Sequence, residues 1–411
     1  MSHILLICAM LIPSAASGAI YYVDSVSGSD AQNGLSAATA WSTLAHAAST
    51  AFAPGDYLLL KRGSTWHEPL VVNSSGAPDT PITISGYGTG ANPVIDGTAW
   101  KGVAADLIYF GGKTDITLDG LQLRNGPLNG LNINNCARIA IRNFTISGNQ
   151  HNGMLVYNCN SVTIETSEIS GNSLNTALSY DGIRLDGSGG AVSGFVVRGC
   201  YIHNNIGGEG WNSANGIFIG HTGGTLPILQ GVQITGNELA FNGNPDQNQA
   251  GRNLTGTFSG DVTVTNNYIH DSASAGIYLG DEGVPVNITI AQNIFYNNSL
   301  RQFGGFTTQT AQAYHNAVFV DNSAITAMGA EVGGTGAWQI TNNSFYYRTP
   351  STDTYRGFIA INDAAQDQHL SSDCNLFYSP TPDRWLRSNG IILNFPQWMG
   401  YGYDLHSVNP Y

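Results

Sequence analysis

A short pattern recurs six times in this chain, and this repeat limits the fold more than any other feature. In each copy a small residue at the second position precedes apolar residues at the third and fifth positions. The copies are NGLNIN (129–134), NGMLVY (152–157), DGIRLD (181–186), NGIFIG (215–220), AGIYLG (275–280) and NAVFVD (316–321).

A second, longer segment follows the short one after a turn, as in ARIAIRNFTIS (137–147) and NSVTIETSEIS (160–170). The two segments alternate about seven times, and their shortest spacing is 23 residues. Such a period predicts one coil of a parallel β-helix per repeat, with the strands of successive coils about 4.8 Å apart. The repeat therefore predicts an all-β fold.

Composition supports this fold class and excludes some partners. The chain has 51 Gly, and 15 Lys plus Arg stand against 28 Asp plus Glu, which gives a net charge of −13. Abundant glycine favours tight turns and short strands over helices. A strongly acidic chain repels nucleic acid and anionic membranes, so we expect neither as a partner.

The first 19 residues contain an apolar run from Ile4 to Ile12, followed by small residues suited to signal cleavage at Ala19. We therefore expect a signal peptide at 1–19, a single β-helix domain at 20–411, and a secreted or periplasmic protein. No later apolar segment reaches the roughly 18 residues that a membrane span needs. Residues 40–52 have helical spacing and predict a short helix that covers the N-terminal end of the core.

One column of the second segments predicts a structural ladder, in which each Asn side chain hydrogen-bonds the next coil. Its predicted members are Cys200, Asn237, Asn267, Asn293, Asn343 and Cys374. Cys136 and Cys159 also fall in one column, 23 residues apart. Coil spacing allows them to form a disulfide, and two stacked buried thiols are the alternative.

Three N-terminal stretches, YYVDSVSGSDAQNGLSAATAWSTLAHA, PGDYLLLKRGSTW and PITISGYGTGANPVIDG, resemble the opening of secreted proteins of the pectate lyase-like superfamily. The resemblance covers nearly the whole chain and implies a right-handed parallel β-helix that is exported and acts on polysaccharide. It does not select a reaction, because the superfamily includes lyases, hydrolases, epimerases and non-catalytic binders. We expect a monomer.

Fourth and sixth positions of the short segments face outward on one sheet, where coil stacking turns them into two columns. The first column is predicted to hold Asn132, Leu155, Arg184, Phe218, Tyr278 and Phe319; the second is predicted to hold Asn134, Tyr157, Asp186, Gly220, Gly280 and Asp321. Exposed aromatic side chains beside polar groups suit sugar rings. Phe218 and Tyr278 are therefore candidate sugar-binding residues.

Near the middle of this sheet, Asp181, Arg184 and Asp186 place three charges in six residues, at outward or edge positions. Hydrolysis of a glycosidic bond needs two carboxyl groups, about 5 to 9.5 Å apart. Asp181 and Asp186 are five residues apart, or about 16 Å along an extended strand, so they cannot pair with each other. We expect Asp186 to act with Glu209, and Asp181 is the alternative member.

Long insertions beside the sheet supply the other candidate residues, because loops on a rigid scaffold commonly carry sites. Trp211 and Arg252 are expected to bind substrate with Arg184, and His221 to orient a carboxylate or bind substrate. Asp281 and Glu282 are expected to form a subsite or to bind metal.

Two other functions stay open from the sequence. A lyase acting on a uronate polymer would use Arg184 or Arg252 as the base, with Ca²⁺ held by Asp181 and Asp186. Arg184 between two carboxylates would be a poor base, but it could bind a substrate carboxylate. The other candidate is a non-catalytic glycan-binding or adhesin-like β-helix, and a simple salt-bridge cluster is the structural alternative for the three charges. We favour hydrolysis, which requires no cofactor.

Overall fold

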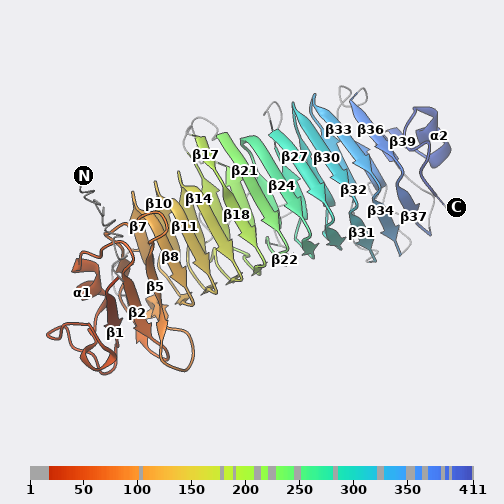
Figure 1. Ribbon diagram of the computed structural model, residues 1–411. Helices are drawn as coiled ribbons and strands as arrows, with labels where there is room; N and C mark the ends of the chain where they lie inside the picture. Colours follow the sequence, from red (N-terminus) through yellow and green to blue (C-terminus); the bar gives the residue numbers. More distant parts are fainter. Residues whose placement is uncertain are drawn as a thin grey trace, which may run out of the picture.

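The strands of this computed structural model follow one another along a single long axis, and Figure 1 shows the chain progressing from one end to the other. Helix α1 (Leu44–Ser49) lies near the N-terminal end and helix α2 (Phe395–Gly400) near the C-terminal end. None of the helices in the described part of the chain is long and apolar enough to cross a membrane. The described residues are 18–100, 105–175, 180–187, 191–207, 214–220, 228–244, 251–280, 286–321, 328–348, 357–362, 369–380, 385–387 and 391–409.

Three sheets run the length of the molecule, and we name them A, B and C. Sheet A contains β1 (Ile20–Val23), β2 (Tyr57–Lys61), β5 (Ile82–Tyr87), β8 (Thr114–Asp119), β11 (Ala137–Arg142), β14 (Asn160–Glu165), β18 (Phe195–Arg198), β21 (Ile228–Thr235), β24 (Ser259–Thr265), β27 (Val286–Ala291), β30 (Thr310–Tyr314), β33 (Ala337–Thr341) and β36 (Leu370–Asp373), with β17 (Ala191–Ser193) beside β21. Sheet B contains β3 (Thr65–Trp66), β6 (Val94–Asp96), β9 (Gln122–Arg124), β12 (Thr145–Ser147), β15 (Glu168–Ser170), β19 (Tyr201–His203), β22 (Glu238–Ala240), β25 (Tyr268–His270), β28 (Ile294–Tyr296), β31 (Ala317–Val320), β34 (Ser344–Tyr347) and β37 (Leu376–Tyr378). Sheet C contains β4 (Leu70–Val71), β7 (Ile108–Gly111), β10 (Leu131–Asn134), β13 (Met154–Tyr157), β16 (Ile183–Asp186), β20 (Ile217–Gly220), β23 (Leu254–Gly256), β26 (Ile277–Leu279), β29 (Arg301–Phe306), β32 (Met328–Gly333), β35 (Gly357–Ile361), β38 (Trp385–Arg387) and β39 (Ile391–Leu393).

Each coil passes from sheet C to sheet A to sheet B, and equivalent strands of successive coils pair in parallel, as β10 pairs with β13 and β13 with β16. The predicted all-β parallel β-helix is therefore confirmed. The short segments from 129 to 280 are strands of sheet C with their flanking residues, and each long segment holds one strand of sheet A and one of sheet B.

The apolar third and fifth positions of the short segments point inward. Leu131 and Ile133 in β10, and Ile183 and Leu185 in β16, are fully buried. Side chains alternate between the two faces of a strand, so the fourth and sixth positions point away from the core. This direction agrees with the sequence prediction.

Two-residue corners join sheet A to sheet B and explain the Asn ladder. The first corner residue takes a positive φ, and the second sends its side chain inward. Asn266, for example, has φ 57°, and Asn267 accepts a hydrogen bond from the Asn237 N–H at 2.9 Å. The observed ladder runs through Cys200, Asn237, Asn267, Asn293, Asn316, Asn343 and Asn375.

Two assignments in the predicted columns were wrong. Cys374 occupies the first corner position, with φ 58°, so the last ladder residue is Asn375. Asn316 is also a corner residue, and the segment 316–321 supplies β31 of sheet B rather than a strand of sheet C. The sheet C strand of that coil is β29, where Gly304 and Gly305 interrupt the apolar alternation.

Short helices at the two ends are capped and partly buried. In α1, Leu44 and Ala47 are buried and the Thr43 side chain caps the first turn, so the predicted N-terminal helix is confirmed. The sequence reading did not anticipate α2, where Trp398 is fully buried against Trp385. Cys136 and Cys159 are free and buried, and the Cys136 N–H donates to the Cys159 Sγ at 3.2 Å.

Candidate functional site

The charged group at the middle of sheet C is a compact ion-pair cluster. Arg184 lies between Leu155 and Phe218 of the neighbouring strands. Its Nη1 is 2.8 Å from Asp181 Oδ2, and its Nε is 3.2 Å from Asp186 Oδ2. The guanidinium carbon also lies 4.3 Å from the centroid of the Phe218 ring. One arginine thus joins two carboxylates and an aromatic ring.

Asp181 and Asp186 meet at the same guanidinium, although the sequence places them five residues apart. Strand β16 begins only at Ile183, so Asp181 belongs to the preceding turn and its side chain reaches the same side of the sheet as Asp186. The expectation that an extended strand keeps the two carboxyl groups apart was therefore wrong. Arg184, however, stands between them.

Asp181 is also a member of a second ladder, at the entrance to the sheet C strands. Its N–H donates to Asn152 Oδ1 at 2.8 Å, and its own Oδ1 accepts hydrogen bonds from the Asn215 N–H and Nδ2 at 3.1 and 2.8 Å. Asn129 and Asn152 hold the equivalent positions in the two preceding coils. An Asp at this position keeps the ladder acceptor and has a second oxygen for Arg184.

The cluster lies deeper than the sequence predicted. Asp181 is 0% exposed, Asp186 5%, Arg184 8% and Phe218 8%, so the outward positions here are buried rather than solvent-facing. Burial raises the pKa of Asp181, while Arg184 and the Asn215 amide oppose this shift. Removing Arg184 would leave two carboxylates buried without a compensating charge.

This geometry limits the chemistry of the three residues. Arg184 donates hydrogen bonds to both carboxylates through its Nε and Nη1, so these two nitrogens already serve the cluster rather than a substrate. It also occupies the space between Asp181 and Asp186 that a Ca²⁺ ion bound by both would need. The described residues contain no group of three His, Cys, Asp or Glu side chains that could hold a metal ion.

A second cluster of charges and rings lies farther along sheet C. Tyr278 in β26 has the guanidinium carbon of Arg252 4.9 Å from its ring centroid and that of Arg301 4.4 Å away. Arg252 also donates to the Thr255 hydroxyl at 2.8 Å. Arg301 forms an ion pair with Glu331 of β32, which is 5% exposed. The predicted residues Arg252 and Tyr278 thus lie together.

Arg301 and Glu331 were missed by the sequence reading. The segment MGAEVG (328–333) does follow the pattern of the short segments, with Glu331 at its fourth position. Aligning it with the other copies would have placed Glu331 on the outer face of sheet C. Arg301 gives a weaker signal because its strand contains two adjacent glycines.

The pairing of the sheet C strands confirms the first predicted column from Asn132 through Leu155 and Arg184 to Phe218. It also places Thr255 in this column, between Phe218 and Tyr278. Phe319 does not belong to this column, because it lies on sheet B between Tyr296 and Tyr346. Asp321 also lies near sheet B, where it accepts a hydrogen bond from the Tyr296 hydroxyl. The remaining predicted site residues lie outside the described residues: Glu209, Trp211, His221, Asp281 and Glu282.

Comparisons with known proteins found similarities in sequence and in structure. A stretch of 95 residues is 37% identical to a lacto-N-biosidase of Bifidobacterium longum subsp. longum, and it covers 22% of this chain and 6% of that protein. The solved GH136 lacto-N-biosidase from Eubacterium ramulus superposes with a TM-score of 0.48 at 14% identity, over 90% of this chain and 68% of that one. An alginate lyase from Paenibacillus sp. str. FPU-7 superposes with a TM-score of 0.49 at 16% identity, over 72% of this chain and 92% of that one.

A family model described as the right handed beta helix region matches residues 129–345, which is more than half of the chain. This stretch contains the coils in which the repeat was recognised, and the parallel strand pairing in the structure agrees with it. The resemblance predicted from the N-terminal stretches is confirmed at the level of fold. The chain belongs to the family of right-handed β-helix proteins.

Proposed function

We propose that this protein is an exported carbohydrate-active β-helix that binds a polysaccharide along the outer face of sheet C and hydrolyses its glycosidic bonds. The observation that carries the proposal is the partly exposed Tyr278 ring on sheet C, with the guanidinium groups of Arg252 and Arg301 beside it. Aromatic rings beside fixed polar groups are suited to sugars. The 37% identical stretch of a lacto-N-biosidase supports carbohydrate as the substrate class.

Asp186 is the catalytic carboxylate we assign among the described residues, since it lies on the outer face of β16 and retains some exposure. Asp181 is fully buried, and we assign it the role of holding Arg184 rather than of touching substrate. Glu331 is five strands from Asp186, or about 24 Å at the usual strand spacing, and cannot be its partner. Glu209 remains our candidate for the second carboxyl group.

A lyase acting on a uronate polymer is the second candidate, and one observation favours it. Arg252 and Arg301 both approach Tyr278, which places two cationic side chains together in a chain with few of them. In this reaction Arg301 would bind a substrate carboxylate. Arg252 would serve as the base, and Ca²⁺ would be an additional requirement.

The first experiment incubates the purified protein with neutral and uronate polysaccharides, with Ca²⁺ or with a chelator. New reducing ends without the ultraviolet absorbance of unsaturated sugars would support hydrolysis. Both signals together, lost with chelator, would support the lyase. Absence of both signals on every substrate would refute catalysis and favour a glycan-binding module. Mass analysis of the protein recovered from an export-competent host tests the proposed cleavage after residue 19.

Variants then test the assigned residues. Asp186→Asn and Glu209→Gln should each reduce turnover about 100-fold or more, as expected for loss of a general acid or base. Asp261→Asn is the matched control, because Asp261 is exposed on sheet A, where it accepts a hydrogen bond from Asn287. Equal turnover in all three variants would refute the catalytic assignment.

A further inference from the structure

The outer face of sheet B carries a repeated arrangement of side chains that the proposed catalytic site does not use. Glu168, Tyr201, Glu238 and Tyr268 lie in register on four successive strands, so that carboxylate and phenol alternate. A histidine follows each tyrosine two residues later, at His203 and His270. The same three residue types thus occur twice, displaced by two coils.

Each copy is held by the same contacts. In the first copy, His203 Nε2 is 3.3 Å from Glu168 Oε1, and the His203 ring stacks on Tyr201 with centroids 3.7 Å apart. In the second copy, His270 Nε2 is 3.3 Å from Glu238 Oε1, and its ring stacks on Tyr268 at 4.1 Å. The carboxylate in each case belongs to the preceding coil. The two copies therefore have matching geometry.

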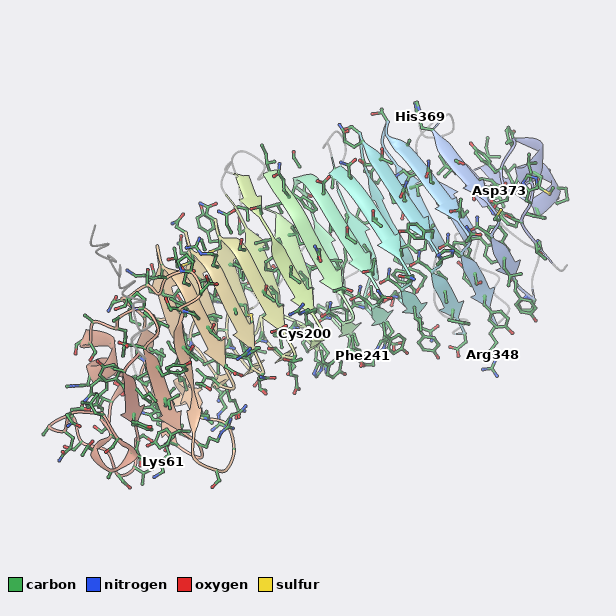
Figure 2. The ribbon with its side chains drawn as sticks, in the orientation of Figure 1. Lys61, Cys200, Phe241, Arg348, His369 and Asp373 are labelled. Atoms are coloured by element: carbon green, nitrogen blue, oxygen red, sulfur yellow. The ribbon has the colours of Figure 1, made fainter. Side chains whose placement is uncertain are left out.

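In both copies the glutamate and tyrosine side chains are partly exposed, whereas the histidines are largely buried behind them. The side chains of Glu168 and Glu238 are 47% and 45% exposed, and Tyr268 is 39% exposed. Beside the second copy, the 44% exposed Phe241 packs edge-on against His270. Figure 2 shows Phe241 projecting from this side of the solenoid.

A shallow hollow of about 470 Å³ adjoins the first copy, and its walls include Asn143, Thr145, Thr166, Ser167, Glu168 and Tyr201. These residues lie at the corners between sheets A and B or at the first positions of β12, β15 and β19, whereas His203 is the last residue of β19. The hollow therefore lies on the corner side of Tyr201, away from His203. Hydroxyl, amide and carboxylate groups therefore line a depression that also contains an aromatic ring. Such a lining can hydrogen-bond the hydroxyl groups of a sugar while the ring packs against its apolar face.

We propose that this face, formed by the two copies and the adjoining hollow, is a second carbohydrate-binding surface that takes an extended, uncharged polysaccharide. The two copies are two coils apart, about 9.6 Å at the usual strand spacing, which is comparable to the length of an extended disaccharide. A polymer with that repeat can place equivalent sugars at both copies. Charge selects against uronate polymers, because Glu168, Glu238 and Asp271 lie on this face of a chain with net charge −13.

The test measures binding in the Asp186→Asn background, which separates this face from cleavage on sheet C. Affinity electrophoresis in native gels containing xyloglucan, galactomannan or mixed-linkage β-glucan should retard the protein with at least one polymer. Polygalacturonate should not. The double variant Tyr201→Ala/Tyr268→Ala should weaken binding about 10-fold or more, because two ring contacts are lost.

The matched control is Tyr346→Ala/Tyr378→Ala, which removes a stacked tyrosine pair from the same sheet, outside the repeated arrangement. It should bind as the parent does, and circular dichroism should show that both double variants are folded. Failure of all three neutral polymers, a preference for polygalacturonate, or equal loss in the two double variants would overturn the proposal. Turnover of short oligosaccharides by Tyr201→Ala/Tyr268→Ala in the otherwise native protein should be unchanged, so failure of this proposal is distinguishable from failure of the hydrolase assignment.

Discussion

Sheets B and C present acidic, basic and aromatic side chains on their outer faces, yet these side chains are more deeply buried on sheet C than on sheet B. The Arg184 side chain is 10% exposed and its partner Asp181 is 0% exposed, whereas Glu168 and Glu238 on sheet B are nearly half exposed. Two-residue corners lead into the sheet B strands, while twelve residues separate β15 from β16. Similar residue types thus form a buried ionic cluster on one face and a solvated surface on the other.

This difference in burial decides whether a substitution on each face is expected to change stability or only binding. A buried charge that loses its partner destabilises the fold, so activity losses on sheet C need a stability control. Exposed pairs contribute little to stability, so binding losses on sheet B report on the ligand directly. Substitutions on sheet C should therefore change stability more than substitutions on sheet B.

Arg184→Met should have the largest effect, a loss of about 3–5 kcal/mol in the free energy of unfolding, because two buried carboxylates lose their shared partner. Urea denaturation measures this loss. The control is Arg198→Met, which removes a 57% exposed arginine from its pair with Glu165 and should cost at most about 1 kcal/mol. Similar losses in the two variants would show that burial does not set the stability cost of losing these ion pairs.

Asp181→Asn should cost less, about 1 kcal/mol, because asparagine occupies this ladder position in the preceding coils and can still accept from Asn215. Arg184 then keeps Asp186 as its partner. Asp181→Ala should cost about 2–3 kcal/mol, since the Asn215 N–H also loses its acceptor. If the two substitutions are equally costly in urea denaturation, the ladder does not contribute as proposed.

The sequence was sufficient to predict the coil, the inward and outward positions of β16 and the presence of Arg184 beside Asp186. These features follow from a two-residue alternation and a regular period, which are local properties. The meeting of Asp181 with Asp186 was not predictable from strand spacing, because it depends on where β16 begins. Burial of the cluster was also missed, since alternation gives the direction of a side chain but not what covers it.

The two glutamate–histidine pairs of sheet B were not predicted from the sequence, for a related reason. Tyr201 and Tyr268 begin the same three-residue pattern, Tyr-Ile-His, but their glutamate partners are 35 and 32 residues away from the histidines they contact. Insertions of different length separate the coils, so a fixed period does not align these residues. Strand pairing in three dimensions was needed to bring each glutamate beside its histidine.

Glu238→Gln tests the solvated face and should change the free energy of unfolding by less than about 0.5 kcal/mol, because Glu238 is an exposed partner of His270. The same variant should weaken binding of the neutral polysaccharide found for the parent, because an amide accepts weaker hydrogen bonds from sugar hydroxyl groups than a carboxylate does. Urea denaturation and affinity electrophoresis provide the two measurements. A stability loss as large as that of Arg184→Met would show that sheet B also depends on its ion pairs for folding.

Asp321 should give the smallest effect, which is a dependence of stability on pH. Hydrogen bonds from Asn297 and then from the Tyr296 hydroxyl lower the pKa of Asp321 below its ordinary value. A lowered folded-state pKa contributes stability at pH values above the unfolded-state pKa, and this contribution is lost as the pH falls through the folded-state pKa. Between pH 6 and pH 3 the parent should therefore lose about a few tenths of a kcal/mol more than Asp321→Asn, since the pair lies near the surface. Thermal unfolding of both proteins across this range measures the difference. Superimposable pH profiles would mean that the tyrosine and asparagine contacts do not favour the ionised carboxylate, and that even the partly buried charges of sheet B behave as solvated groups.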